Sequence, residues 1–273
     1  MIVLLPPSEG KTPADSGPTL DLWDLHFPDL APERRTVLDT LREVSAAPDA
    51  LERLGVGKSL GADVERNTRL ETIPCAPALL TYTGVLYAAL GLTDSEVALT
   101  TDGGSGTTGA DTTDDATTTT LRARLEEVYV SSGLFGIVGA LDPVPAYRLA
   151  MKTKLGDLGT LSTWWKKRLS PVLDEEFAGR PVLDCRSTDY RKSWPGDPAL
   201  TAVVNVFTEK DGKRTVVSHN AKHTRGELVG HLLRDPAPWP EDLDSLVERA
   251  AAHYRVEFTA STGRKPAALD VVL

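Results

Sequence analysis

Cysteine is scarce in this sequence, with only Cys75 and Cys185 among its 273 residues. Two cysteines so far apart form neither a disulfide framework nor a zinc cluster, and this usage is typical of the reducing cytoplasm. Long hydrophobic runs are also missing, because no apolar stretch approaches the roughly 20 residues that a membrane helix needs. The first five residues carry no basic segment and run into Pro6, so we expect a buried strand there and not a signal peptide.

An excess of basic residues is missing as well, since the formal net charge is −9. Proteins that bind nucleic acid without sequence preference are usually basic, so the negative net charge argues against such a role for the whole surface. The charge is nevertheless uneven. Residues 145–230 contain 15 Lys and Arg residues against 10 Asp and Glu, whereas the rest of the chain contains 15 against 29. This asymmetry permits a basic cleft on an acidic body.

Apolar strand-like runs alternate with helix-like segments along the chain, which predicts a mixed α/β (α+β) fold with a mixed sheet flanked by helices. Asp211-Gly212 between two apolar runs predicts an antiparallel hairpin. We expect residues 1–273 to form a single domain. The expected helices cover 31–45, 77–90 (with Gly91 as its cap), 121–127, 161–177 and 242–253, with another beginning near Thr224. The expected strands cover 2–5, 128–131, 182–185, 202–209, 214–218, 256–261 and 269–273.

Residues 101–120 are rich in Thr, Gly and Asp and contain almost nothing that can be buried. A segment of this composition buries too little apolar surface to offset the conformational entropy that it would lose on folding. We therefore expect a flexible, low-complexity surface loop without a function of its own.

Polar residues gather just after apolar runs at several points, notably in 145–154 and 218–226. A strand end followed by a Gly or Ser turn offers backbone N–H groups, and arginine adds a bidentate fork for phosphate or carboxylate. The candidate anion-binding residues of this kind are Ser8, Lys11, Ser131, Arg148, Lys154, Ser187, Lys222 and Arg225.

Residues 51–67 have the outline of a helix-hairpin-helix, with Gly55-Val56-Gly57-Lys58 at the turn. In that motif the turn amides contact a DNA phosphate, and Lys58 would add a contact that is independent of sequence. The alternative is a plain helical hairpin in which Gly55 and Gly57 act only as caps.

Other motifs fail on inspection. Gly10-Lys11-Thr12 lacks the first glycine of a P-loop, because that position is Leu5. His219 and His223 have neither the glutamate nor the third ligand of a zinc site, so we expect no metal and no cofactor. No Gly-x-Ser-x-Gly nucleophile elbow is present. The best candidates for proton transfer are Asp184 and Tyr190, with Asp142 as a further possible base or cap.

Taken together, these segments resemble the YaaA peroxide-stress protein family, once a family of unknown function. The similar stretches occur in order along nearly the whole chain: Leu4–Thr12, Lys58–Asn67, Thr83–Tyr87, Ser131–Leu141, Ala146–Leu155, Asp184–Tyr190 and Val217–Gly226. The resemblance implies a role in surviving hydrogen peroxide by restraining free iron and the damage that iron causes. The acidic segment 101–120 departs from the family pattern as an insertion.

The resemblance also implies an unusual α/β fold that binds DNA through a positively charged cleft and a helix-hairpin-helix. The hairpin would fall on residues 54–58. The cleft residues would be Lys11, Arg148, Lys154, Lys222 and Arg225.

Two functions therefore stay open. The first is a cytoplasmic, monomeric protein that binds double-stranded DNA with low sequence specificity, since few Asn or Gln residues are placed to read base edges. The second is an enzyme that acts on a nucleotide, a purine-like compound or another small phosphorylated substrate in the same polar cleft. Direct iron sequestration does not fit the residues, because no cluster of His and carboxylates has ligand spacing.

Overall fold

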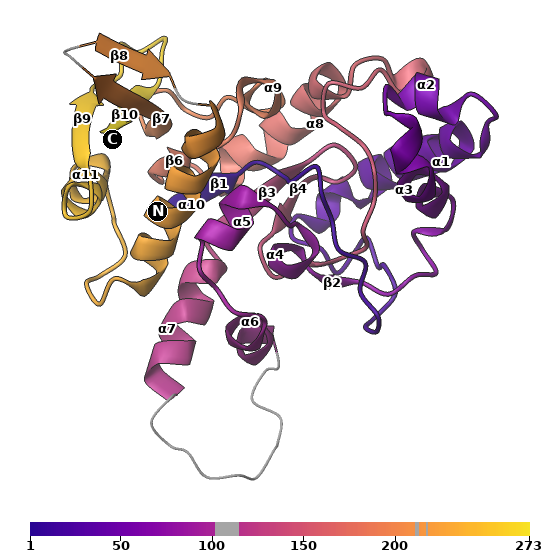
Figure 1. The fold of residues 1–273 in the computed structure, drawn as a ribbon, viewed down its shortest axis with the longest axis horizontal. Helices are drawn as coiled ribbons and strands as arrows, with labels where there is room; N and C mark the ends of the chain where they lie inside the picture. Colours follow the sequence, from indigo (N-terminus) through magenta and orange to yellow (C-terminus); the bar gives the residue numbers. More distant parts are fainter. Residues whose placement is uncertain (102–114, 211–212, 217) are drawn as a thin grey trace.

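The computed structural model describes residues 1–101, 115–210, 213–216 and 218–273. Figure 1 shows a mixed sheet flanked by helices, as the sequence predicts. In the described part of the chain the sheet has eight strands, in the order β4-β3-β1-β6-β7-β10-β9, with β8 paired to β7. The five strands from β3 to β10 along this order run parallel, whereas β4, β8 and β9 pair in the antiparallel direction.

The strands of this sheet are β1 (Ile2–Leu5), β3 (Val128–Ser132), β4 (Gly136–Gly139), β6 (Val182–Asp184), β7 (Thr201–Lys210), β8 (Lys213–Val216), β9 (Arg255–Thr259) and β10 (Ala267–Val272). A separate pair is formed by β2 (Ala76–Pro77) and β5 (Pro143–Val144). The α-helices are α1 (Ala31–Ala46), α2 (Ala50–Leu54), α3 (Gly61–Arg66), α4 (Ala78–Thr81), α5 (Val85–Ala89), α6 (Asp94–Thr101), α7 (Asp115–Leu125), α8 (Leu161–Glu176), α9 (Thr188–Arg191), α10 (Ser218–Arg234) and α11 (Leu243–Ala251). Short 3-10 turns η1 to η4 cover Pro28–Leu30, Lys58–Leu60, Asn67–Arg69 and Gly156–Leu158.

The centre of the sheet is fully buried, since every residue of β1, β3 and β6 is covered. Parallel strands covered on both faces need continuous apolar runs, which explains the Ile-Val-Leu-Leu sequence of β1. Because β1, β3 and β6 are parallel neighbours, their carboxyl ends meet at one edge of the sheet. The polar segments that follow β1 and β6 therefore lie at the same edge.

The helix expected over 77–90 is interrupted in the structure, where α4 ends at Thr81 and α5 begins at Val85. Backbone pairing from a distant segment causes the break, because Thr12 N–H donates to the Thr81 carbonyl at 2.9 Å and Lys11 forms a bridge with Tyr82. Gly84 then adopts a φ of 113°, which residues with a side chain rarely adopt. The predicted end is confirmed, since Gly91 has a φ of 66°.

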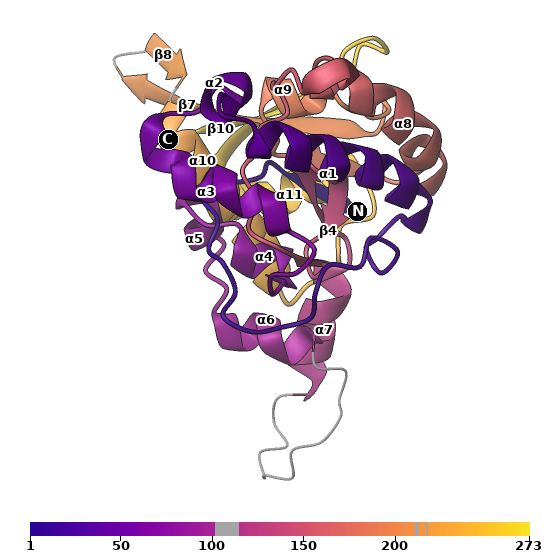
Figure 2. The ribbon, with the colours of Figure 1, turned by 90° about the vertical axis from the view of Figure 1, so that its right-hand side faces the viewer.

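A loop is expected over 101–120, but both ends of this segment are helical in the structure. Residues 102–114 lie outside the described residues. Thr101 ends α6, and residues 115–120 belong to α7. The two helices lie side by side at one end of the molecule (Figures 1 and 2), where the buried Leu121 and Leu125 anchor α7. Arg124 secures it further by donating to four carbonyl groups in residues 232–237.

α10 begins at Ser218, six residues earlier than the sequence suggests, so the polar segment 218–226 lies on its first turns. None of the helices in the described ranges has the length and apolar character that a membrane crossing requires.

Candidate functional site

Two pockets lie beside the loop that follows β1, and Glu9 lines both of them. The first, which we name the basic pocket, has a volume of about 540 Å³. It is lined by Glu9, residues 52–56, residues 148–150 and residues 152–154, which include Arg53, Arg148, Lys152 and Lys154. The second, which we name the α10 pocket, has a volume of about 400 Å³. It is lined by residues 6–9 and 84–87 together with Ser187, Tyr190, Lys222 and Arg225.

The cleft residues expected from the sequence are thus divided between two places. Arg148 and Lys154 line the basic pocket, whereas Lys222 and Arg225 line the α10 pocket together with Ser8 and Ser187. Gly55 lines the basic pocket, but Gly57 and Lys58 line neither.

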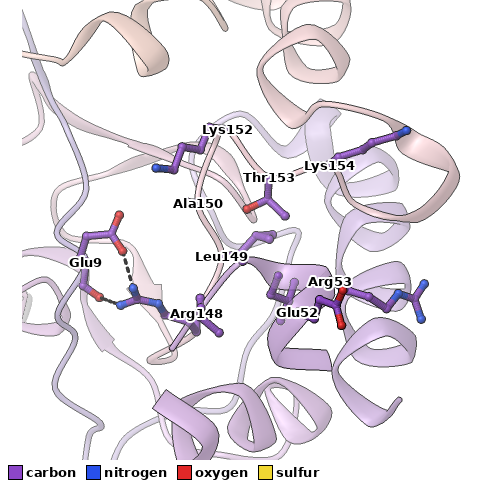
Figure 3. Close-up of a pocket in the computed structure, with 12 residues that line it drawn as sticks. Glu9, Glu52, Arg53, Arg148, Leu149, Ala150, Lys152, Thr153 and Lys154 are labelled. Carbon is purple, nitrogen blue, oxygen red and sulfur yellow. Dashed lines mark hydrogen bonds and ion pairs between the residues drawn. The ribbon is translucent and has the colours of Figure 1, made fainter. Parts of the chain in front are cut away.

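Arg148 is the best-placed cation of the basic pocket. Its guanidinium pairs with the Glu9 carboxylate at 2.7 Å and donates to the Glu9 carbonyl at 2.9 Å (Figure 3). Figure 3 also shows Lys152 directed toward the side where Glu9 lies, whereas Lys154 and Arg53 point away from it. Arg148 and Lys152 are therefore the two cations on the Glu9 side of the pocket.

The backbone of Arg148 is fixed by Asn67, a buried residue at the start of η3. Arg148 N–H donates to Asn67 Oδ1 at 2.8 Å, and Asn67 Nδ2 donates to the Arg148 carbonyl at 2.9 Å. Asn67 Nδ2 also lies 3.2 Å from Ser45 Oγ on α1. These two reciprocal hydrogen bonds join the backbone of Arg148 to the element expected over 51–67.

That element consists of α2, a turn, η2 and α3. Gly55 ends α2 in the left-handed conformation, with a φ of 65°, and its N–H bonds to the last turn of the helix. A Cβ atom at Gly55 or Gly57 would meet nothing within 4 Å, so the turn is open to a large partner. Lys58 is exposed just beyond it.

Lys11 lines neither pocket and lies in an aromatic environment. Its Nζ donates to the Ser8 carbonyl at 2.9 Å and lies 4.3 Å from the ring centre of Tyr147. Burial lowers the pKa of the Lys11 ammonium to about 7, against the opposing effect of Glu9, and the nearby Arg148 lowers it further. Lys11 is therefore a cation whose charge depends on pH near neutrality.

Hydrogen bonds fix two of the residues that line the α10 pocket, Arg225 and Tyr87. Arg225 donates from Nε and Nη2 to the Val204 carbonyl, at 3.1 and 2.7 Å. Tyr87 donates its hydroxyl to the Pro6 carbonyl at 2.8 Å. Burial raises the pKa of the Tyr190 hydroxyl, so that Tyr190 stays protonated at neutral pH.

Asp184 and Ser131 are buried and line neither pocket. Both Asp184 oxygens accept from the Arg186 guanidinium, at 2.9 and 2.8 Å, and both side chains are at most 1% exposed. Ser131 Oγ is buried 3.5 Å from Arg186 Nη1. The carboxylate of Asp184 is thus already occupied, which favours a structural role over proton transfer.

Asp142 is also engaged, because its carboxylate lies 2.5 Å from His26 Nδ1 and accepts from the His26 and Gly139 backbone N–H groups. The hydrogen bond to Asp142 raises the pKa of His26. On α10, His223 pairs with Glu227 at 3.0 Å.

Residues that sequence reasoning missed include Arg53 and Lys152 of the basic pocket, and also Glu9, Asn67 and Arg186. Arg186 had a visible signal, since it follows Asp184 by two residues after a buried strand. Neither Glu9 nor Asn67 carries a comparable signal, because each acts on Arg148 across at least 81 positions of sequence.

Known proteins resemble this chain over most of its length. The profile of the family described as Peroxide stress protein YaaA matches residues 111–258. A UPF0246 protein of Corynebacterium glutamicum is 37% identical over 256 residues, covering 92% of this chain and 93% of the relative. A UPF0246 protein of Streptomyces coelicolor is 36% identical, covering 100% of this chain and 98% of the relative. A UPF0246 protein of Dinoroseobacter shibae is 26% identical, covering 88% and 85%.

Proposed function

Because the chain belongs to the family of YaaA peroxide stress proteins, we propose that it protects against peroxide by binding double-stranded DNA with low sequence specificity. Binding at the basic pocket would limit iron-dependent damage to the bound DNA. The observation that carries this proposal is the convergence of Arg148 and Lys152 with the open turn at Gly55 around one pocket. Cations beside an open backbone turn suit phosphate contacts, which carry little sequence information.

The ion pair between Arg148 and Glu9 is compatible with phosphate binding. The Glu9 side chain is 63% exposed, so its carboxylate is well solvated. The Arg148 side chain is only 17% exposed, so the pair is exposed on the Glu9 side alone; a pair that is open to water on one side contributes about 1 kcal/mol, and a DNA phosphate can replace the solvated carboxylate. The bidentate geometry of arginine matches phosphate as well as carboxylate.

The proposal is tested by fluorescence anisotropy with a short labelled duplex across a range of salt concentrations. We expect wild-type binding to weaken steeply with salt, with each neutralised phosphate contributing about −0.9 to the log–log slope. Arg148→Ala should weaken binding about tenfold, the effect of losing a charge-assisted contact of about 1.5 kcal/mol. Lys58→Ala should make the log–log slope less steep by about 0.9, the contribution of one phosphate contact.

A matched control is Arg255→Ala, which removes a cation from β9 at the opposite end of the sheet (Figure 1). Its affinity for the duplex should remain at the wild-type value. Equal losses in Arg255→Ala and Arg148→Ala would indicate diffuse charge and not a site. Binding that stays flat between low and moderate salt would refute the proposal outright.

DNA affinity is also expected to depend on pH through Lys11. Because its pKa is lowered to about 7, the Lys11 ammonium is mostly charged at pH 6 and mostly neutral at pH 8. Lys11 lines neither pocket, so its charge acts on a bound phosphate from a distance, and affinity should fall by at most about fivefold over this range, or about 1 kcal/mol. Anisotropy titrations at constant ionic strength should show this fall in the wild type and a flatter profile in Lys11→Met. Parallel profiles of the two proteins would exclude Lys11 as the titrating group.

A second candidate function is an enzyme that acts on a nucleotide or another small phosphorylated substrate. It is favoured by the position of the α10 pocket at the edge where β1 and β6 end, where α/β sheets often place catalytic groups. Since Asp184 is paired with Arg186, Tyr190 is the remaining candidate for proton transfer. Turnover of a phosphorylated compound that is lost in Tyr190→Phe would support this function.

A further inference from the structure

The α10 pocket has two chemically different walls. Five of its lining residues are apolar or aromatic and belong to the β1 loop and α5: Pro6, Pro7, Val85, Leu86 and Tyr87. α10 contributes the cations Lys222 and Arg225, and the remaining lining residues are Ser8, Glu9, Gly84, Ser187 and Tyr190. Its volume of about 400 Å³ lies within the range of roughly 300–1,000 Å³ that is typical of small-molecule sites.

The walls are fixed in place by several independent contacts. The two bonds from Arg225 to the Val204 carbonyl use two of the five donors of the guanidinium and hold its plane against β7. The Tyr87 hydroxyl ties the Pro6 carbonyl to α5. Gly84 brings its backbone against Ser8, because a Cβ atom there would lie 2.9 Å from Ser8 Oγ. A pocket built in this way is largely formed before a ligand arrives.

The charge of the pocket favours an anion. Among its lining residues Glu9 is the acidic one, and the Glu9 carboxylate pairs with Arg148 on the side of the basic pocket. Lys222 is exposed and Arg225 is half-buried, so both remain reachable from solvent. A phosphate group bound by an ammonium and a guanidinium would form charge-assisted hydrogen bonds to both.

We propose that the α10 pocket binds a small phosphorylated molecule with a flat aromatic ring, of about the size of a nucleoside monophosphate. The phosphate contacts Lys222 and Arg225, and the flat ring packs against Pro6, Pro7 and Leu86. The proposal rests on the second candidate function, because it names the ligand class of the same pocket, but the site is separate from the basic pocket and does not depend on DNA binding. The binding requires no chemical step.

The test is titration calorimetry of the full chain with AMP, with inorganic phosphate and adenosine as the two partial ligands. We expect AMP to bind at least tenfold more tightly than either partial ligand. Lys222→Ala should lower the affinity for AMP at least tenfold and leave the affinity for adenosine unchanged, because Lys222 contacts the phosphate. Val85→Asp, which places a charge in the apolar wall, should weaken AMP and adenosine.

Lys152→Ala, in the basic pocket, is the matched control and should leave AMP affinity unchanged. Lys222 is exposed, so its replacement is not expected to disturb folding. AMP affinity that is equal in wild type and Lys222→Ala, or no better than that of phosphate, would overturn the proposal, as would the absence of AMP binding.

The duplex titration of the same variants separates this proposal from the DNA function. Lys222→Ala should keep the wild-type affinity for the duplex and lose affinity for AMP. Arg148→Ala should lose affinity for the duplex and keep the wild-type affinity for AMP. Loss of both ligands in both variants would mean that the two pockets form a single site, which would refute the separate α10 site.

Discussion

Replacing Asp184 with alanine is expected to lower the free energy of unfolding by about 3–5 kcal/mol. The replacement leaves the Arg186 guanidinium without its carboxylate, in a place where both side chains are at most 1% exposed. The contacts of Arg186 with the Trp194 carbonyl at 2.7 Å and with Ser131 Oγ at 3.5 Å would remain, but neither oxygen neutralises the charge. Urea unfolding followed by tryptophan fluorescence measures the change.

The matched control is Asp189→Ala, which breaks the ion pair between Asp189 and Lys192 on the neighbouring helix α9. That pair has a similar length, 3.0 Å, but its side chains are 49% and 61% exposed. Its loss should cost less than about 1 kcal/mol. The double variant Asp184→Ala/Arg186→Met should recover part of the stability lost in Asp184→Ala. An Asp184→Ala protein as stable as Asp189→Ala would contradict a structural role and return Asp184 to the candidates for proton transfer.

Replacing Gly226 with alanine is expected to lower stability by about 1–3 kcal/mol through overpacking. Gly226 lies on α10 where this helix packs against α5, and a Cβ atom there would lie 2.2 Å from the Leu86 carbonyl oxygen. The same atom would lie 2.8 Å from Ala89 Cβ. Because the obstacle is backbone, the two helices must separate to make room. Thermal unfolding of Gly226→Ala measures the cost.

Gly61→Ala is the control for the Gly226 substitution. Gly61 starts α3 with an ordinary helical φ of −54°, and a Cβ atom there would meet nothing within 4 Å. Alanine should therefore be neutral at this position or stabilising by about 0.5–1 kcal/mol. A Gly226→Ala protein with wild-type stability would show that α5 and α10 can move apart freely. The walls of the α10 pocket would then be adjustable, contrary to the fixed walls described above.

The sequence predicts local elements of this protein well and long-range contacts poorly. The fold class, β1 and α1 follow from apolar patterning and capping residues within a few positions. The break between α4 and α5 does not, because its cause is backbone pairing with Thr12, about seventy positions away. Patterning within one segment carries no information about such pairing.

The candidate site shows the same limit. The sequence marks Arg148, Lys222 and Arg225 as anion-binding residues, but it cannot tell one cleft from two pockets. That division depends on the β1 loop, whose Glu9 lies between the two cavities and lines both. The residue types predict the chemical class of the ligand, and the topology determines how many separate pockets are formed.

The contact between Asn67 and Arg148 has a consequence for the dynamics of the protein. The Arg148 amide donates to a side chain, so its protection from hydrogen exchange depends on the docking of the α3–η3 segment. Local opening that releases Asn67 would expose this amide and free the backbone of the central arginine, while the sheet stays folded. The exchange rate of one amide would therefore report how often the basic pocket is assembled.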